Sequence, residues 1–186
     1  AYATGFVPMF GVNRPAIAET GLRAAYTRDA LRLELACADA AARRIKADAR
    51  LGADLQAIGR RYDRRIDDAV VAVLQPRPPD GPLFLFTVNP KGVKLGERCL
   101  PGGSREGRAW VRESAWQADA RVAAGGWRAE LALPFALLEA RPRKGAAWGL
   151  NAYRFFRDDM LDPHTWAPTT AWKLADPDQC GRLAWA

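Results

Sequence analysis

Side chains that could perform acid–base or nucleophilic chemistry are few in this sequence and poorly spaced for it. Asp67 and Asp68 are adjacent, and Glu130 lies in the middle of an alternating run. Hydrolysis of a glycosidic bond needs an acid and a base about 5 to 10 Å apart, whereas neighbouring side chains in a strand diverge. No nucleophile paired with a base and no phosphate-binding loop accompanies these residues. The sequence therefore predicts that the chain is not an enzyme.

Metal and haem ligation rest on two small groups of residues. Asp67 and Asp68 could cap the turn into the following strand, hold Arg154 or help bind calcium, which takes about six to eight oxygen ligands. His164, the sole histidine, lies four residues from Met160, and a His–Met pair can ligate haem iron. A lone histidine in a loop is more simply solvated. Calcium stays open, and haem binding is the less favoured hypothesis.

The three cysteines, Cys37, Cys99 and Cys180, leave an odd thiol in any disulfide scheme. None belongs to a Cys-x-x-Cys pair, so zinc binding and thioredoxin-like chemistry are unsupported. Cys37 continues the alternation of the leucines at 31, 33 and 35, which predicts a buried thiol. A Cys37–Cys180 bridge is the alternative.

Two alternating runs indicate half-buried strands. In residues 126–134, Trp127, Ala129, Leu131 and Leu133 share one face, and the run stops at Pro134. Residues 148–154 alternate in the same way, which predicts that Trp127 and Trp148 belong to the core. Asn151 and Arg154 differ by three positions, so they point to opposite faces of a regular strand.

The other segments follow the same pattern of strands and turn signals. Residues 20–26 and 31–38 predict a hairpin, and residues 68–75 predict a strand covered on both faces. Apolar residues at helical spacing predict a short helical insertion around residues 40–62. Further strands are expected at 83–89, 109–114, 120–123 and 181–185, and polar loops at 96–107 and 158–178. The predicted fold is an all-β antiparallel sandwich.

Length and composition fit one domain spanning residues 1–186. A chain of 186 residues supports a single core, and no apolar run approaches the roughly 20 residues of a membrane span. The first residue is Ala rather than Met and no signal peptide is visible, so a mature or excised domain is expected. The net charge is +7, with 23 Arg and five Lys, yet no nucleic-acid-reading motif is present. Solvated surface charge is the favoured interpretation, and no nucleic-acid partner is predicted.

Six motifs in order resemble a known family. An acidic pair enters a Val-rich strand at residues 67–74, and Phe-x-Val-Asn-Pro-x-Gly follows at 86–92. Next come Gly-Trp-x-x-Glu-x-x-x-Pro-Phe at 126–135 and Trp-Gly-x-Asn-x-x-Arg at 148–154. Trp-Ala-Pro at 166–168 and Gly-Arg-Leu at 181–183 complete the series. From about residue 20 to 185 the chain resembles family 9 carbohydrate-binding modules, within the wider DOMON-like β-sandwiches.

The resemblance implies a jelly-roll sandwich that is extracellular or periplasmic, is often attached to a polysaccharide-degrading enzyme, and binds saccharides without catalysis. Sugar-binding members clamp a sugar between two Trp rings, and Trp172 matches one of them. The second is replaced here by Arg64-Arg65-Ile66, which leaves Tyr62 as the nearest aromatic substitute. A family Arg is replaced by Thr87. The implied ligand-binding residues are Trp172, Trp166, Asn89, Tyr62, Asn151 and Arg154, with Asp67 and Asp68 as the metal candidates.

Two alternatives remain open. The missing second Trp and the Arg-rich segment 43–65 fit a structural or interaction domain of a larger secreted or cell-surface protein, with no affinity for sugar. Some DOMON-like sandwiches bind haem, for which His164 and Met160 are the candidates.

Overall fold

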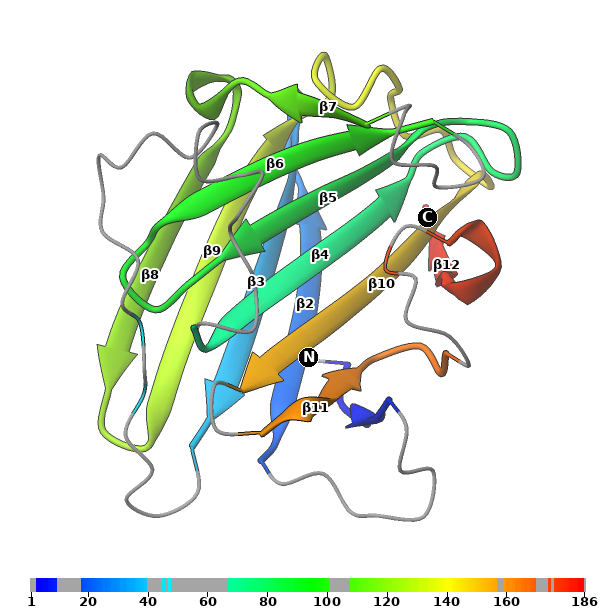
Figure 1. The fold of residues 1–186 in the computed structure, drawn as a ribbon. Helices are drawn as coiled ribbons and strands as arrows, with labels where there is room; N and C mark the ends of the chain where they lie inside the picture. The colour runs from blue at the N-terminus through cyan, green and yellow to red at the C-terminus, as the bar shows by residue number, and fades with distance from the viewer. Residues whose placement is uncertain are drawn as a thin grey trace.

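Two antiparallel β-sheets packed face to face form the fold in the computed structural model. It describes residues 3–9, 18–39, 45, 47, 67–100, 108–156, 159–169, 174 and 176–185, with the backbone alone at 108 and 159–162. The larger sheet lies in front of the smaller one in Figure 1. The predicted all-β antiparallel sandwich is therefore confirmed. The predicted helical insertion at 40–62 lies outside the described residues, apart from Ile45 and Ala47.

The larger sheet has eight strands in the described chain, ordered β1-β11-β10-β4-β5-β6-β7, with β12 also paired to β10. The smaller sheet has the order β2-β3-β9-β8. The strands are β1 (Val7–Pro8), β2 (Thr20–Tyr26), β3 (Ala30–Ala38), β4 (Ala69–Gln75), β5 (Leu83–Val88), β6 (Lys94–Cys99), β7 (Arg108–Val111), β8 (Gln117–Ala123), β9 (Gly126–Pro134), β10 (Ala147–Phe156), β11 (Asp159–Thr165) and β12 (Gly181–Ala184). Two short 3-10 helices, η3 (Glu113–Ala115) and η4 (Pro177–Gln179), connect strands.

Strand burial follows the sequence pattern. Every residue of β4 is buried, because apolar side chains pack on both faces of the larger sheet. In β9 the apolar residues alternate with exposed ones, since its outer face meets solvent. The hairpin between β2 and β3 closes on Thr27, whose hydroxyl accepts a hydrogen bond from the N–H of Ala30 at 3.2 Å. These three predictions are confirmed.

The main core fills the space between the sheets. The predicted core residues Trp127 and Trp148 are buried there, with leucines of β3 facing valines and phenylalanines of β4 and β5. At one end of this core Trp148 packs edge-on against Trp185, with ring centroids 4.9 Å apart, and against Phe135. Aromatic side chains bury the most apolar area per residue, so this cluster closes the end of the sandwich.

The sequence prediction was wrong at two polar segments that form strands. Residues 96–99, expected as the start of the loop 96–107, belong to β6, and Gly96 lies where the ring of Trp116 approaches the sheet. A Cβ at Gly96 would stand 2.7 Å from Val111 Cβ and 3.1 Å from Trp116 Nε1, so this glycine permits close packing rather than a break. Residues 159–165 form β11 within the expected loop, because tertiary pairing with β1 and β10 outweighs a weak local signal.

No disulfide joins any two of the three cysteines. Cys37 lies in the core between the sheets, whereas Cys180 packs against the cluster on the opposite face of the larger sheet. The alternative Cys37–Cys180 bridge is therefore not present. Burial raises the pKa of Cys37 to about 12, and burial together with the charge of Asp176 raises that of Cys180 to about 11. Both thiols stay protonated at neutral pH, as expected of packing residues.

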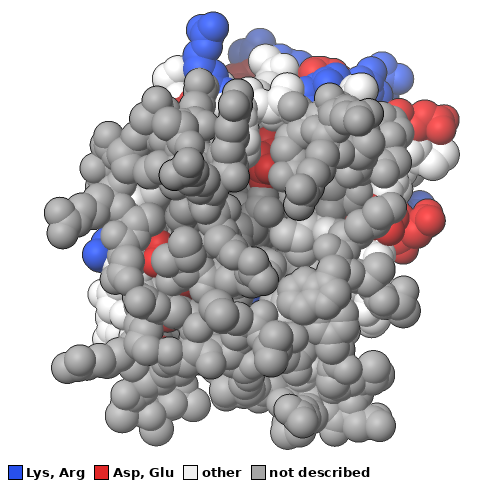
Figure 2. All heavy atoms as spheres, viewed as in Figure 1, with Lys and Arg blue, Asp and Glu red and all other residues white. Residues whose placement is uncertain are grey.

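Charged side chains of both signs share the rim of the molecule. In Figure 2 the described Lys and Arg side chains gather along the upper rim, with Asp and Glu among them. Among the described ion pairs, Glu139 accepts hydrogen bonds from Arg98 Nε at 2.9 Å and from Arg77 at 3.3 Å. No helix in the described segments is long and apolar enough to cross a membrane.

Replacement of Trp148 by Ala should lower the free energy of unfolding by about 3 to 5 kcal/mol, because it opens a cavity in the aromatic cluster. The control is Val122→Ala, since the Val122 side chain is 58% exposed and should cost less than about 0.5 kcal/mol. Urea unfolding followed by Trp fluorescence and circular dichroism measures both. Equal losses in the two variants would contradict this account of the core.

Candidate functional site

Strand β10 pairs with two different strands along one of its sides. Its first half pairs with β12 over Ala147–Leu150, and its second half pairs with β11 from Tyr153 onward. Between these partners, the carbonyl of Ala152 accepts a hydrogen bond from the N–H of Trp166 at 2.9 Å. The segment that follows β11 therefore occupies the gap. This segment begins the loop that holds the predicted ligand residues Trp166 and Trp172.

The side chain of Asn151 fixes this junction. It is fully buried, and both ends of its amide bind protein groups. Its Nδ2 donates to the carbonyls of Gln179 (2.7 Å) and Ala167 (3.2 Å) and to the Tyr153 hydroxyl (3.1 Å). Its Oδ1 accepts from the N–H groups of Ala152 (2.8 Å) and Ala167 (2.9 Å) and from Thr165 Oγ1 (3.2 Å). An Asn side chain carries two donors and one acceptor oxygen, so these contacts engage both ends of the amide. Asn151 is thus a positioning residue for the loop.

Trp166 lies against the backbone of β12. It is partly buried and packs against the main core. A Cβ built on Gly181 would lie 2.8 Å from Trp166 Cζ3, so the ring occupies space that any other residue at 181 would need. One edge of the ring, at Cζ3, approaches the backbone of β12 at Gly181, and part of the side chain is accessible. A fixed aromatic surface of this kind is suited to stacking.

The segment containing Trp172 is anchored at both of its described ends. Thr169 is buried and donates a hydrogen bond from its hydroxyl to Gln179 Oε1. On the other side, Asp176 caps η4 by accepting from the N–H of Asp178 at 3.2 Å. The carbonyl of Gln179 then accepts from Asn151. Trp172 itself lies outside the described residues, as does Tyr62, so their predicted stacking roles stay predictions.

Asn89 shapes the turn between β5 and β6. Its Oδ1 accepts from the N–H groups of Lys91 (3.0 Å) and Val93 (2.9 Å), and its Nδ2 donates to Asp67 Oδ2 at 2.9 Å. Gly92 completes the turn at a φ of +77°, a conformation that favours glycine. Asn89 and Asp67 are fully buried. Asn89 thus holds the backbone of this turn in place, and its contact with Asp67 ties the turn to the residues before β4.

Arg154 faces the interior of the sandwich, opposite to Asn151 on the same strand, as their spacing predicts. Its guanidinium donates to the carbonyls of Ala38 (2.7 Å) and Glu19 (3.2 Å) and to Thr20 Oγ1 (3.2 Å). It also lies 4.4 Å from the centroid of the Phe156 ring. These acceptors belong to or flank the smaller sheet. Arg154 therefore ties the two sheets together.

His164 is not the solvated loop residue that the sequence indicated. It belongs to β11, is fully buried, and packs edge-on against Phe156 with ring centroids 4.7 Å apart. The side chain of Met160 lies outside the described residues. The contact of His164 with Phe156 is a packing contact, and haem binding stays the less favoured prediction.

Asp67 and Asp68, the predicted metal candidates, directly precede strand β4. Both are buried, and Asp67 Oδ2 accepts a hydrogen bond from Asn89. In the described segments no group of three or more His, Cys, Asp or Glu side chains could hold a metal ion. Calcium takes about six to eight oxygen ligands, backbone and amide oxygens among them, so calcium binding at this pair stays a prediction.

A surface that the sequence did not single out lies on the outer face of the smaller sheet. A groove of about 460 Å³ runs across β3, β9 and β8, lined by Arg32, Glu34, Gln117, Asp119 and Glu130 among others. In the sequence these residues alternate with core residues. That alternation indicates that they face solvent, but it does not indicate a groove. The register that brings them together depends on tertiary pairing, so sequence alone could not locate the groove.

Comparison with solved structures shows which fold this is. A family 9 carbohydrate-binding module from Caldicellulosiruptor kristjanssonii in complex with cellotriose overlays with a TM-score of 0.67 at 10% identity, covering 98% of this chain and 80% of that one. A module of the same family and organism in complex with glucose gives 0.63 at 12% identity, covering 91% and 78%. A protein of Bacteroides uniformis described as a candidate carbohydrate-binding protein gives 0.64 at 16% identity, covering 96% and 85%.

No protein-family model and no curated protein matches the sequence. The structural neighbours therefore establish the fold, and at these identities they establish the fold alone. This chain has the fold of family 9 carbohydrate-binding modules, as its motifs predicted. Membership of the wider DOMON-like group stays a prediction.

Replacement of Asn151 by Ala should lower the free energy of unfolding by about 3 kcal/mol or more, since it leaves several buried carbonyl and N–H groups without partners. Arg182→Ala, at an exposed position on the adjoining strand β12, should change it by less than about 0.5 kcal/mol. Chemical denaturation measures both. A neutral effect of Asn151→Ala would show that the junction does not depend on this amide.

Proposed function

We propose that this chain is a non-catalytic carbohydrate-binding module that holds a saccharide at the sheet edge next to Trp166. The observation that carries the proposal is the overlay of nearly the whole chain, 98%, on a family 9 module in complex with cellotriose. The anchored loop after β11 adds support, because a stacking site needs aromatic rings held in fixed positions. The partners expected are mono- or oligosaccharides.

Binding at this edge would combine stacking with hydrogen bonds. Trp172 supplies the main aromatic surface, Tyr62 the opposing one, and Trp166 a fixed wall between the loop and β12. Stacking supplies most of the affinity, and polar groups of the loop select among sugar hydroxyls. Asn89, Asn151 and Arg154 act in this proposal as positioning residues, because their polar atoms bind the protein's own groups.

Several features support a role without catalysis. Asp67 and Asp68 are buried, so neither reaches a bound sugar directly. The neighbouring modules in complex with saccharide are binding domains by their description. We propose that the domain acts outside the cytoplasm, joined to other domains of a longer polypeptide that it brings to a polysaccharide.

The alternative function is a structural or interaction domain with no affinity for sugar. The observation that favours it is the internal use of Asn89, Asn151 and Arg154, three of the residues expected to bind ligand. A domain of this kind would use its surface to pack against a neighbouring domain.

Trp172→Ala should weaken the binding of cellotriose or xylotriose by at least about tenfold, which corresponds to about 1.4 kcal/mol of lost stacking. Isothermal titration calorimetry measures the affinity, and the melting temperature should stay unchanged. The matched control is Trp110→Ala, at a partly buried position on β7, which should leave affinity unaltered. Folded wild-type protein that binds no saccharide would support the structural alternative instead.

A further inference from the structure

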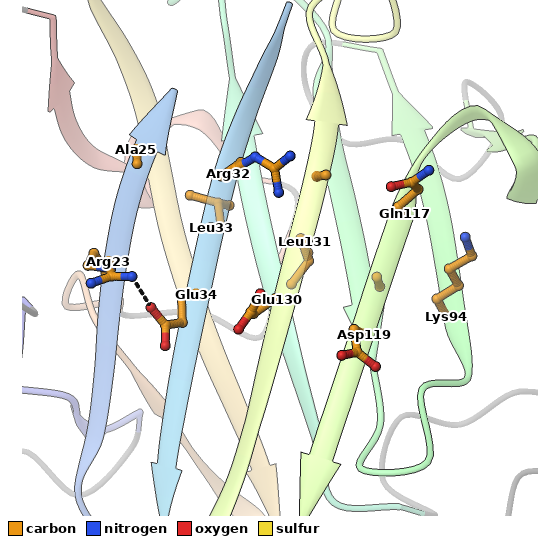
Figure 3. A pocket seen from close by; sticks show the side chains of 12 residues that line it. Arg23, Ala25, Arg32, Leu33, Glu34, Lys94, Gln117, Asp119, Glu130 and Leu131 are labelled. Atoms are coloured by element: carbon orange, nitrogen blue, oxygen red, sulfur yellow. Dashed lines mark ion pairs between the residues drawn. The ribbon is translucent and has the colours of Figure 1, made fainter. Parts of the chain in front are cut away.

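The outer face of the smaller sheet carries ordered rows of polar side chains. Cross-strand register places Arg23, Glu34, Glu130 and Asp119 in one row across β2, β3, β9 and β8. The adjacent row holds Ala25, Arg32, Ala132 and Gln117. Side chains within a row stand about 5 Å apart, and the rows are about 7 Å apart. Figure 3 shows these side chains standing on the strands, with Arg32 reaching from β3 toward β9.

Short side chains leave room between the polar ones. Ala25 and Ala132 lie on either side of Arg32, and Lys94 of β6 lines the groove at its far side. The volume of about 460 Å³ falls within the range of about 300 to 1,000 Å³ found for small-molecule sites. The groove is therefore large enough for a small-molecule ligand.

Some of the charged groups in the groove are already fixed in place. Glu34 is only 7% exposed, and its carboxylate is held between Arg23 at 2.7 Å and Arg128 at 2.9 Å. Lys94 Nζ donates to the carbonyl of Trp116 at 2.6 Å and lies 5.0 Å from the centroid of its ring. Preorganised groups lose little conformational entropy when a ligand binds.

Two charged groups remain open to a ligand. Glu130 and Arg32 are exposed and form no ion pair within the described part of the chain. They lie in adjacent rows on neighbouring strands, so one carboxylate and one guanidinium face the same space. Together with Gln117 they offer both acceptors and donors of hydrogen bonds.

The charges of the groove cancel. Its lining holds three cationic side chains, Arg23, Arg32 and Lys94, and three anionic ones, Glu34, Asp119 and Glu130, so its formal charge is zero. Arg128 and Arg121 pair with Glu34 at 2.9 Å and with Asp119 at 2.8 Å from outside this lining, so the balance of charge holds for the lining residues and not for the whole outer face. A polyanion would meet Glu130 and Asp119, and a polycation would meet Arg32 and Lys94. The hydroxyl groups of a neutral saccharide chain both donate and accept hydrogen bonds, so they match the donors and the acceptors of the groove.

We propose that this groove is a second saccharide site, selective for neutral oligosaccharides. This inference rests on the proposed carbohydrate-binding function and adds a surface separate from the Trp166 edge. The described lining residues include no aromatic side chain, so hydrogen bonds supply its affinity. We expect binding there to be weaker than at a stacking site.

The test uses calorimetry and NMR titration with cellotetraose on four proteins: wild type, Trp172→Ala, the double variant Arg32→Ala/Glu130→Gln, and the combined triple variant. Trp172→Ala should retain weak binding, seen as shifts of the Glu130 and Gln117 amides. In the triple variant the affinity of this remaining binding should fall by about tenfold. Arg141→Ala, a 66% exposed arginine in a loop, is the matched control and should change nothing. Thermal melting checks that each variant is folded.

The outcomes separate the two proposals. Binding that Trp172→Ala abolishes completely would overturn the groove site and leave the edge site standing. Binding that survives Trp172→Ala and is lost in the double variant would support the groove site. It would also show that Trp172 does not contribute to binding. Equal or tighter binding of chitosan tetramer or tetragalacturonate at the groove would overturn its selectivity for neutral chains. No saccharide binding by folded wild-type protein would overturn both proposals.

Discussion

The division of β10 between two partners is the constraint on which the rest of the structure depends. One strand forms hydrogen bonds with β4 along its length on one side, and on the other side it passes from β12 to β11. Such a change of partner leaves backbone groups exposed at the point of transfer, and buried groups of this kind must be satisfied. Asn151 satisfies them from within the strand. The loop that follows β11 is thereby fixed to the sheet, and the proposed saccharide edge is built on that loop.

Burial of polar residues follows from the same arrangement. Asn89, Asn151 and Arg154 each connect segments that are distant in sequence, and each uses its polar atoms for that purpose. A sandwich with both faces of β4 buried has little backbone accessible to water, so side-chain hydrogen bonds must replace water at turns and junctions. Residues that resemble a ligand set in the sequence thus also hold the fold together. In the proposals made above, ligand contact falls to aromatic rings at the edge and to the open face of the smaller sheet.

Sequence patterns predicted much of this fold because period-two alternation reports directly on burial. Trp127 with its neighbours in β9 was identified on that basis, whereas β4 was identified from its unbroken Val-rich run. The strands β6 and β11 were missed since their residues, such as Gly96 and Pro163, carry turn signals. Pairing partners and close packing decide their structure, and neither can be read from a local window. The buried His164 was missed for the same reason, and the outer groove depends on register between four strands.

Backbone NMR of uniformly 15N-labelled protein titrated with cellotriose tests the central claim most directly. The account predicts that the largest shifts fall on amides at the edge of β10, among them Trp166, Ala167 and Thr169, with Gln179 on the facing segment. Small shifts on the outer face of the smaller sheet are compatible with it. Saturable shifts that leave all of these edge amides unchanged would contradict the claim that the loop anchored by Asn151 forms the saccharide site.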